Sequence, residues 1–315
     1  MNKKLVVLTG LVGFAAVAAA FAPSSYSAGG GSSGGGSGMH GGGRSVAEHR
    51  PLNAAAALSV RNTAGSIRVE AWDKSEIDLT GQLSDNVERL EFSGDANDLH
   101  IDVRLKKGDH SSYADTRLLL KVPRDVVLTL EGTSADLFVN GLRGKLTART
   151  VSGDVDLKVD SSELVAQSVS GDVSVDAPKA TLTTVTTVSG ETELRGPSGV
   201  LRAESVSGDI NLSGGTFTAL DLKSVSGDVE VRAATAADAA VKAESLSGDV
   251  RFNATGLLNA KVSLKSFSGD KHCNISDAAE PVADGRRNRY TVGNGKGQIS
   301  LTSFSGNVVL DGQDK

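Results

Sequence analysis

One six-residue unit recurs eight times, beginning at Thr150 as Thr-Val-Ser-Gly-Asp-Val, and it limits the possible folds more than any other feature. Its glycines are Gly153, Gly171, Gly190, Gly208, Gly227, Gly248, Gly269 and Gly306. Successive glycines are 18, 19, 18, 19, 21, 21 and 37 residues apart. A fixed period of this size is typical of a solenoid or another array of stacked repeats. The final long step predicts one degenerate coil between Lys271 and Gln298.

Apolar residues recur at fixed places around each glycine. One column precedes the Ser-Gly pair: Val151, Val169, Val188, Val206, Val225, Leu246, Phe267 and Phe304. A second stands four residues after the glycine: Leu157, Val175, Leu194, Leu212, Val231, Phe252, Cys273 and Leu310. We expect both columns to face inward with the glycine, as in a half-buried strand of period two. Upstream, Leu201, Ala203 and Ser205 alternate inward, so the chain must bend beside Val206. Each coil is therefore predicted to contain two short strands and a corner.

A meander of hairpins is the structural alternative. A three-residue Ser-Gly-Asp turn would pair Val151 with Val155, but it would also place Arg149 opposite Leu157. The same mismatch would recur in every copy, although facing cross-strand partners are usually alike in character. Stacked coils place like residues over like, which the columns favour. The sequence thus predicts an all-β solenoid with about 18–21 residues per coil.

The N-terminus has the pattern of a secretory signal peptide. Lys3 and Lys4 precede an apolar run from Leu5 to Ala22, and small residues follow near Ala28. An uncleaved membrane anchor is the alternative, but glycines and alanines make the run a weak span. We expect a signal peptide at 1–28, a Gly/Ser-rich linker at 29–52 and a β-solenoid domain at 53–315. The protein is then exported, to the periplasm, the cell surface or the medium.

Charge and cysteine content exclude several partners. Loss of Lys3 and Lys4 changes the net charge from −5 to −7. An acidic chain has no electrostatic reason to bind nucleic acid or an anionic membrane, so we expect neither nucleic-acid binding nor membrane insertion after signal removal. Cys273 is the single cysteine, which excludes an internal disulfide. Its column predicts a small buried hydrophobe; intermolecular pairing is the alternative.

Residues 53–150 are predicted to form earlier, less regular coils. The segments Ala64-Gly-Ser-Ile-Arg-Val and Ser134-Ala-Asp-Leu-Phe-Val are weak copies of the repeat unit. Helical periodicity is nearly absent. The segment Arg44–Asn53 is expected to cover the N-terminal edge.

Two features are candidate binding sites. The first is an acid column, which the coils would stack about 4.8 Å apart: Asp154, Asp172, Glu191, Asp209, Asp228, Asp249 and Asp270. Unit charges at that distance repel by about 1 kcal/mol in water. Either hydrogen bonds from turn amides or from the preceding serine offset this repulsion, or Ca²⁺ lies between coils on Asp154, Asp172, Asp209, Asp228, Asp249 and Asp270.

The second candidate is the basic cluster in the final insertion: Arg286, Arg287, Arg289 and Tyr290. Arginines beside a tyrosine can bind a sugar acid or a phosphate. The alternative is a solvated loop that closes the end of the solenoid.

The chain resembles the DUF4097 family of adhesin-like proteins and its DUF2807-like, autotransporter-adhesin-like relatives. The resemblance rests on Arg61-Asn-Thr-Ala-Gly-Ser-Ile-Arg-Val-Glu-Ala-Trp72, Leu120-Lys-Val-Pro-Arg-Asp, the Ser-Gly-Asp-Val repeats and Gly297-Gln-Ile-Ser-Leu-Thr-Ser-Phe-Ser-Gly-Asn-Val. It covers about residues 55–312. It implies a right-handed, single-stranded parallel β-helix and supplies no catalytic residues.

The sequence shows no nucleophile–base–acid set, no zinc-ligand spacing and no phosphate-binding loop. We therefore expect a non-catalytic, adhesin-like module that binds a glycan or protein of the envelope or the extracellular space. A purely structural envelope scaffold is the first alternative, and a polysaccharide-active β-helix enzyme is the second.

Overall fold

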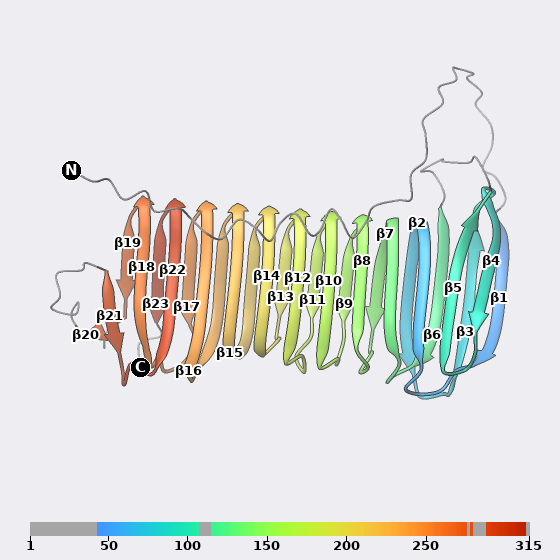
Figure 1. Cartoon of the computed structure of the whole chain (residues 1–315), viewed down its shortest axis with the longest axis horizontal. Coiled ribbons are helices and arrows are strands. Elements are labelled where there is room, and N and C mark those ends of the chain that lie inside the picture. Colours follow the sequence, from blue (N-terminus) through green and yellow to red (C-terminus); the bar gives the residue numbers. More distant parts are fainter. Residues whose placement is uncertain (1–42, 107–114, 276–277, 280–287, 313–315) are drawn as a thin grey trace, which may run out of the picture. The chain divides into compact units, whose positions relative to one another are not determined.

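A computed structural model describes residues 43–106, 115–275, 278–279 and 288–312. Its strands all lie in one compact unit, which runs from Gly42 to Lys315. The predicted signal peptide and the linker as far as residue 42 lie outside the described residues. The described residues form 23 strands and no helix, which confirms the all-β class (Figure 1).

The strands fall into three groups along the chain. The N-terminal group is β1 (Arg44–Pro51), β2 (Ala57–Trp72), β3 (Glu76–Leu83), β4 (Val87–Gly94), β5 (Asp98–Leu105) and β6 (Thr116–Pro123). The middle group is β7 (Val127–Asn140), β8 (Leu146–Ser152), β9 (Val155–Lys158), β10 (Glu163–Ser170), β11 (Val173–Asp176), β12 (Leu182–Ser189), β13 (Thr192–Arg195), β14 (Gly199–Ser207), β15 (Ile210–Ser226), β16 (Val229–Ser247) and β17 (Val250–Ala254). The C-terminal group is β18 (Ala260–Ser268), β19 (Lys271–Asn274), β20 (Ala278–Ala279), β21 (Arg289–Val292), β22 (Gly297–Ser305) and β23 (Val308–Gly312).

Successive copies of the repeat stack in parallel. β10 pairs with β8 on one side and with β12 on the other, and β11 pairs in the same way with β9 and β13. Within a coil, the Ser-Gly-Asp corner separates the two strands. Equivalent residues face each other across every pair, such as Val173 with Val155 and Thr192. This register confirms the solenoid and excludes the hairpin meander.

The column before the Ser-Gly pair faces outward, so its predicted burial is wrong. The buried column is the one before it: Thr150, Ser168, Thr187, Ser205, Ser224, Ser245 and Ser303. The side-chain alternation changes within Ser-Gly-Asp, because Ser205 and Ile210 are both buried while Val206 is partly exposed. In the later coils this hydroxyl donates to a glycine carbonyl of the preceding coil, whereas the hydroxyls of Ser168 and Ser205 are buried without a partner. The Ser245 hydroxyl, for example, donates to the Gly227 carbonyl oxygen at 2.9 Å.

The glycine of the corner lies against the glycine of the coil before it. A Cβ built on Gly208 would lie 2.0 Å from the Gly190 carbonyl oxygen. The corresponding distance from Gly227 to the Gly208 carbonyl oxygen is 2.4 Å. These separations are far below van der Waals contact, so the stack at this corner requires glycine. The tight inward position predicted for Gly208 is confirmed.

The N-terminal end is a cap of mixed strand direction. The weak repeat copies in β2 and β7 do form stacked coils, paired in parallel from Ala57 to Glu70. β5 and β6 continue the stack beyond β2, but β4 is antiparallel to β5, and β3 is antiparallel to β6. β1 is antiparallel to β3. Residues 44–51 thus cover the N-terminal edge as expected and belong to the folded unit, although the predicted linker included them.

The last coil of the sequence is not the last coil of the stack (Figure 1). β22 lies between β16 and β18 and is parallel to both. β23 lies between β17 and β19 in the same way. The coil of Ser303 is therefore inserted between the coils of Ser245 and Ser266, and we call β22–β23 the inserted coil. The order of the repeats in the sequence would place Phe304 and Leu310 in the terminal coil, but both lie in the inserted coil.

The predicted degenerate coil after Lys271 is also wrong. In the described part of that segment, β20 pairs antiparallel with β21, and β21 pairs antiparallel with the outer edge of β18. The terminal coil is β18–β19, and this end position explains why a polar residue, Lys271, stands in one of its core columns. Lys271 occupies the column of Val308 but donates from its Nζ to the carbonyl oxygens of Ser266 and Gly269, at 3.3 and 3.0 Å. A lysine in this column is tolerated because no further coil formed by the described residues covers it.

Cys273 stacks on Leu310, which confirms its column. It is only half-buried because it lies in the terminal coil. Burial raises the pKa of the Cys273 thiol, and the thiolate is the reactive form.

We expect iodoacetamide to label Cys273 slowly at neutral pH. The labelling rate should increase only at a pH above the pKa of an ordinary cysteine thiol. The protein should run as a single chain on gels without reductant. In a control with Cys273→Ser and Ser268→Cys, the thiol moves to an exposed position and should label quickly. Equal rates, or a reducible dimer, would count against this placement.

Candidate functional site

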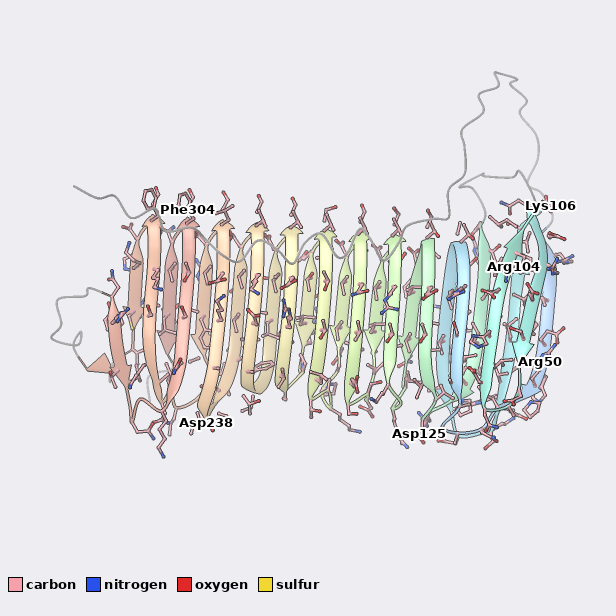
Figure 2. The ribbon with its side chains drawn as sticks, in the orientation of Figure 1. Arg50, Arg104, Lys106, Asp125, Asp238 and Phe304 are labelled. Atoms are coloured by element: carbon pink, nitrogen blue, oxygen red, sulfur yellow. The ribbon has the colours of Figure 1, made fainter. Side chains whose placement is uncertain are left out.

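The outward column forms a continuous apolar strip along one corner of the stack. We call it the contact ridge: Val151, Val169, Val188, Val206, Val225, Leu246, Phe304 and Phe267, in spatial order. Exposure increases toward the C-terminal coils, with 37% for Leu246, 47% for Phe304 and 80% for Phe267. Figure 2 shows the Phe304 ring projecting beyond the strand ends at this edge. Large apolar residues exposed in one contiguous row are typical of an interaction surface.

The two phenylalanines form a stacked pair at the end of the ridge. Their ring centroids are 4.8 Å apart, and the planes differ by 4°. Phe267 and Phe304 are 37 residues apart in sequence and become neighbours only because the inserted coil lies next to β18. The sequence pattern identified the residues of the ridge but placed them inside, so it missed this surface.

The acid column forms a hydrogen-bonded ladder between coils. The Asp228 backbone N–H donates to Asp209 Oδ1 at 2.8 Å, and the Asp249 N–H donates to Asp228 Oδ1 at 2.8 Å. The same bond joins Asp154 to Asp136, Asp172 to Asp154, Glu191 to Asp172, Asn307 to Asp249 and Asp270 to Asn307. Turn amides are therefore the donors, as expected, but each amide belongs to the coil that follows the coil of the carboxylate that accepts its hydrogen bond. The sequence analysis missed Asp136 and Asn307, of which Asn307 separates two carboxylates.

Calcium between the coils stays a prediction. The described residues include no group of three or more His, Cys, Asp or Glu side chains arranged to hold a metal ion. Each backbone bond of the ladder uses one oxygen of a carboxylate, and at Asp249 the second oxygen also accepts from the Asn307 side-chain amide at 3.4 Å. An asparagine can accept the same bond through its amide oxygen.

We expect thermal melts of the wild type to show the same midpoint in millimolar calcium and in chelator. The double variant Asp209→Asn, Asp228→Asn should be as stable as the wild type or more so, because it keeps the acceptors and loses repulsion. A calcium-dependent rise in the wild-type midpoint that the double variant lacks would instead support calcium on the ladder.

The basic cluster is only partly described. Arg286 and Arg287 lie outside the described residues, whereas Arg289 and Tyr290 lie in β21. Tyr290 faces Val262 of β18 and packs partly against the core, and burial raises the pKa of its hydroxyl. Arg289 faces Ser263 on the outer side of the sheet. The two side chains therefore leave opposite faces of one strand, but both residues line the same surface hollow, and binding by the cluster stays a prediction.

Arg289 lies at one end of a surface hollow of about 780 Å³ over β15, β16, β22, β18 and β21. We call it the β22 hollow. Its polar lining residues are Asp221, Lys242, Lys261, Ser263, Arg289, Tyr290, Thr291, Gln298 and Ser300, and its apolar ones are Leu201, Ala219, Leu220, Ala240, Val241, Val262 and Ile299. Lys242 and Lys261 are cations that the sequence analysis did not single out. Only the order of coils brings them near Arg289, and the sequence order of the repeats does not show it.

The fold and these surfaces define a repeat protein of stacked β-coils with a long exposed ridge. The sequence profile of the Toastrack family, DUF4097, matches residues 55–311. The match covers most of the chain, and the protein belongs to the Toastrack DUF4097 family. No curated protein matches it.

Solved structures give weaker similarities. A protein from Bacteroides fragilis NCTC 9343, provisionally named an adhesin, is 16% identical, with 85% of this chain and 97% of that chain covered and a TM-score of 0.35. A Parabacteroides distasonis ATCC 8503 protein, provisionally named lipid-binding, is 14% identical, with 87% of this chain and 98% of that chain covered and a TM-score of 0.39. A provisionally named adhesin from Parabacteroides merdae ATCC 43184 is 11% identical, with 87% of this chain and 98% of that chain covered and a TM-score of 0.34. These values are too low to support an argument about function.

Within the described ranges, the search for a helix long and apolar enough to span a membrane finds none.

Proposed function

We propose that the protein is an exported, non-catalytic, adhesin-like module that binds a glycan or protein of the envelope or the extracellular space. The contact ridge is the observation that carries this proposal. It is apolar along its length, and the exposed serines of the repeat flank it, including Ser207, Ser226 and Ser247. Such a strip offers apolar contact and hydroxyl groups side by side.

The dimensions of the ridge favour a glycan over a protein. It is one side chain wide, and eight coils at about 4.8 Å give a length on the order of 35 Å. A stable protein–protein interface needs about 800 Å² on each partner, which a strip of this width does not supply. An extended sugar chain can follow the strip, place apolar ring faces on its side chains and end on the Phe267–Phe304 pair.

The test is a glycan array probed with residues 29–315, with capture assays from envelope extracts as a second readout. The variant Phe267→Ser, Phe304→Ser should lose at least tenfold in apparent affinity for any ligand found. The matched control is Leu257→Ser, since Leu257 is 74% exposed but lies off the ridge. Both variants should keep the wild-type melting midpoint within a few degrees.

Unchanged binding by the double-Ser variant would rule out the ridge as the contact surface. Assays of reducing-sugar release on the same glycans test the non-catalytic part of the proposal separately. Sustained release of new reducing ends would overturn it.

A further inference from the structure

The β22 hollow has one end that is rich in unpaired donors. Among the described residues, neither Lys261 nor Arg289 has a carboxylate within 4.0 Å, and no side-chain hydrogen bond is formed by Ser263, Thr291, Gln298 or Ser300. By contrast, most lysines and arginines on the outer face of the coils pair with an acid, as Lys242 does with Glu244 at 2.8 Å. Other described cations such as Arg232, Arg251 and Lys265 also lack a carboxylate partner, but Lys261 and Arg289 are the two that line the hollow together.

Strand register brings these donors together. Across the sheet, one row runs Arg289, Ser263, Ser300, Lys242 and Asp221. The neighbouring row runs Thr291, Lys261, Gln298, Ala240 and Ala219. Arg289 and Lys261 lie on adjacent strands, with hydroxyl and amide groups between and beside them.

The one acidic side chain among the described lining residues lies at the other end of the hollow. Asp221 is four strands from Arg289, or roughly 19 Å at about 4.8 Å per strand. It pairs with Lys223 at 3.2 Å. Its charge therefore does not cancel the two cations, and Ala219 and Ala240 make the row beside it apolar at that end of the hollow.

We propose that the β22 hollow binds a carboxylate- or phosphate-bearing ligand through Lys261 and Arg289, and that this site exists only while the inserted coil is in place. Lysine supplies a compact charge, and arginine supplies a fork of donors suited to planar or tetrahedral oxyanions. The hydroxyls of Ser263 and Ser300 complete the set. This site is separate from the contact ridge, and its residues do not overlap with it.

The dependence on the inserted coil follows from the pairing partners of β22. Ile299 faces Val241 on one side and Val262 on the other, and Ser303 likewise faces Ser245 and Ser266. Without β22, β18 matches β16 directly in the same register. Gln298 and Ser300 would then be absent, and Lys261 and Arg289 would move one strand spacing toward Asp221. A ligand that binds only the inserted state stabilises that state by mass action.

The experiment uses the full exported chain and two probes: inorganic phosphate and a galacturonic acid trimer. The methyl ester of the trimer is the uncharged control. Calorimetry should detect the charged probes and not the ester. The variant Lys261→Ala, Arg289→Ala should weaken binding at least tenfold, whereas Arg251→Ala, an exposed arginine on β17, should leave it within twofold. Preference for one probe over the other distinguishes a sugar carboxylate from a phosphate group.

The coupling is tested with a matched pair of core variants. Leu301 and Leu222 are fully buried and occupy the same column, with Ala243 between them. Leu301→Ala should speed amide exchange in β22 and weaken probe binding several-fold, whereas Leu222→Ala should leave binding within twofold. In the wild type, the bound probe should slow amide exchange from Gln298 to Ser305.

No binding of either probe would overturn the site. Equal binding by Leu301→Ala and the wild type, with exchange in β22 unaffected by the probe, would overturn the coupling. The ridge variant Phe267→Ser, Phe304→Ser should bind the two probes as the wild type does, because the ridge and the hollow share no residues. The proposal for the ridge can therefore fail while the proposal for the hollow holds, and the reverse.

Discussion

Replacing Gly208 with valine is expected to lower the free energy of unfolding by about 3 kcal/mol, at the upper end for overpacked sites. The new Cβ would lie 2.0 Å from a backbone carbonyl oxygen of the preceding coil, and the two branches of valine add further contacts. Gly190 lies at the corner between the paired strands β12 and β13, so its backbone cannot move aside as a flexible side chain can. Equilibrium denaturation with urea, monitored by circular dichroism, measures the change.

The matched control is Gly256→Val. A Cβ on Gly256 meets only the Ala234 Cβ, at 3.9 Å. This variant should change the free energy of unfolding by less than about 1 kcal/mol, as is usual for a surface site. If the two variants are equally stable, the corner does not depend on the close approach of successive glycines.

Deletion of residues 297–315 is expected to have a larger effect. The deletion removes four buried apolar side chains, namely Ile299, Leu301, Val308 and Leu310. Burial of each contributes roughly 1.5–3 kcal/mol, so the total of about 6–12 kcal/mol is comparable to the whole stability of a domain. It also leaves the facing edges of β16 and β18 without their partner, and unpaired edges promote aggregation. Direct pairing of β18 with β16 recovers part of the lost contact but not the lost core.

Size-exclusion chromatography with light scattering and a thermal melt test this deletion. The truncated chain should aggregate at micromolar concentration or melt at least 10 °C lower, at about 4 °C or less per kcal/mol for a chain of this size. A shorter deletion of residues 313–315 is the control and should behave as the wild type. A monomeric 297–315 deletion with an unchanged midpoint would be incompatible with a coil inserted between two others.

Most of the fold follows from the repeat, because stacked coils place equivalent residues over one another and the columns are visible in the sequence. The outward position of Val206 did not follow. An apolar residue next to a serine normally marks the core, but here the serine or threonine is the inward residue in every regular coil, and only Ser224, Ser245, Ser266 and Ser303 donate to a glycine carbonyl of the neighbouring coil. Only the geometry of the corner shows where the alternation changes.

One residue in the sequence, Lys271, indicates which coil ends the stack, and the analysis of the repeat spacing did not use it. Lys271 interrupts an otherwise almost wholly apolar column, and Val308 restores it one repeat later. A charge in a core column is tolerated only at an end of the stack, so Lys271 indicates the terminal coil. The candidate site was predictable as far as Arg289, since arginine in a loop indicates binding. Lys261 and Ser300 were not, because their proximity to Arg289 depends on which coil lies between them.

The inserted coil also sets the order in which the protein can be assembled. A simple solenoid can grow at one end, each new coil docking on the last as the chain is delivered. Here the coil of Ser266 becomes available before the coil of Ser303, although the latter lies between it and the rest of the stack. The final step must therefore open or fill a gap, and growth at the end alone cannot complete it. The hollow and the phenylalanine pair both depend on that step, so neither exists until residues up to Gly312 have folded. A chain that stops short of the final coil therefore lacks both surfaces.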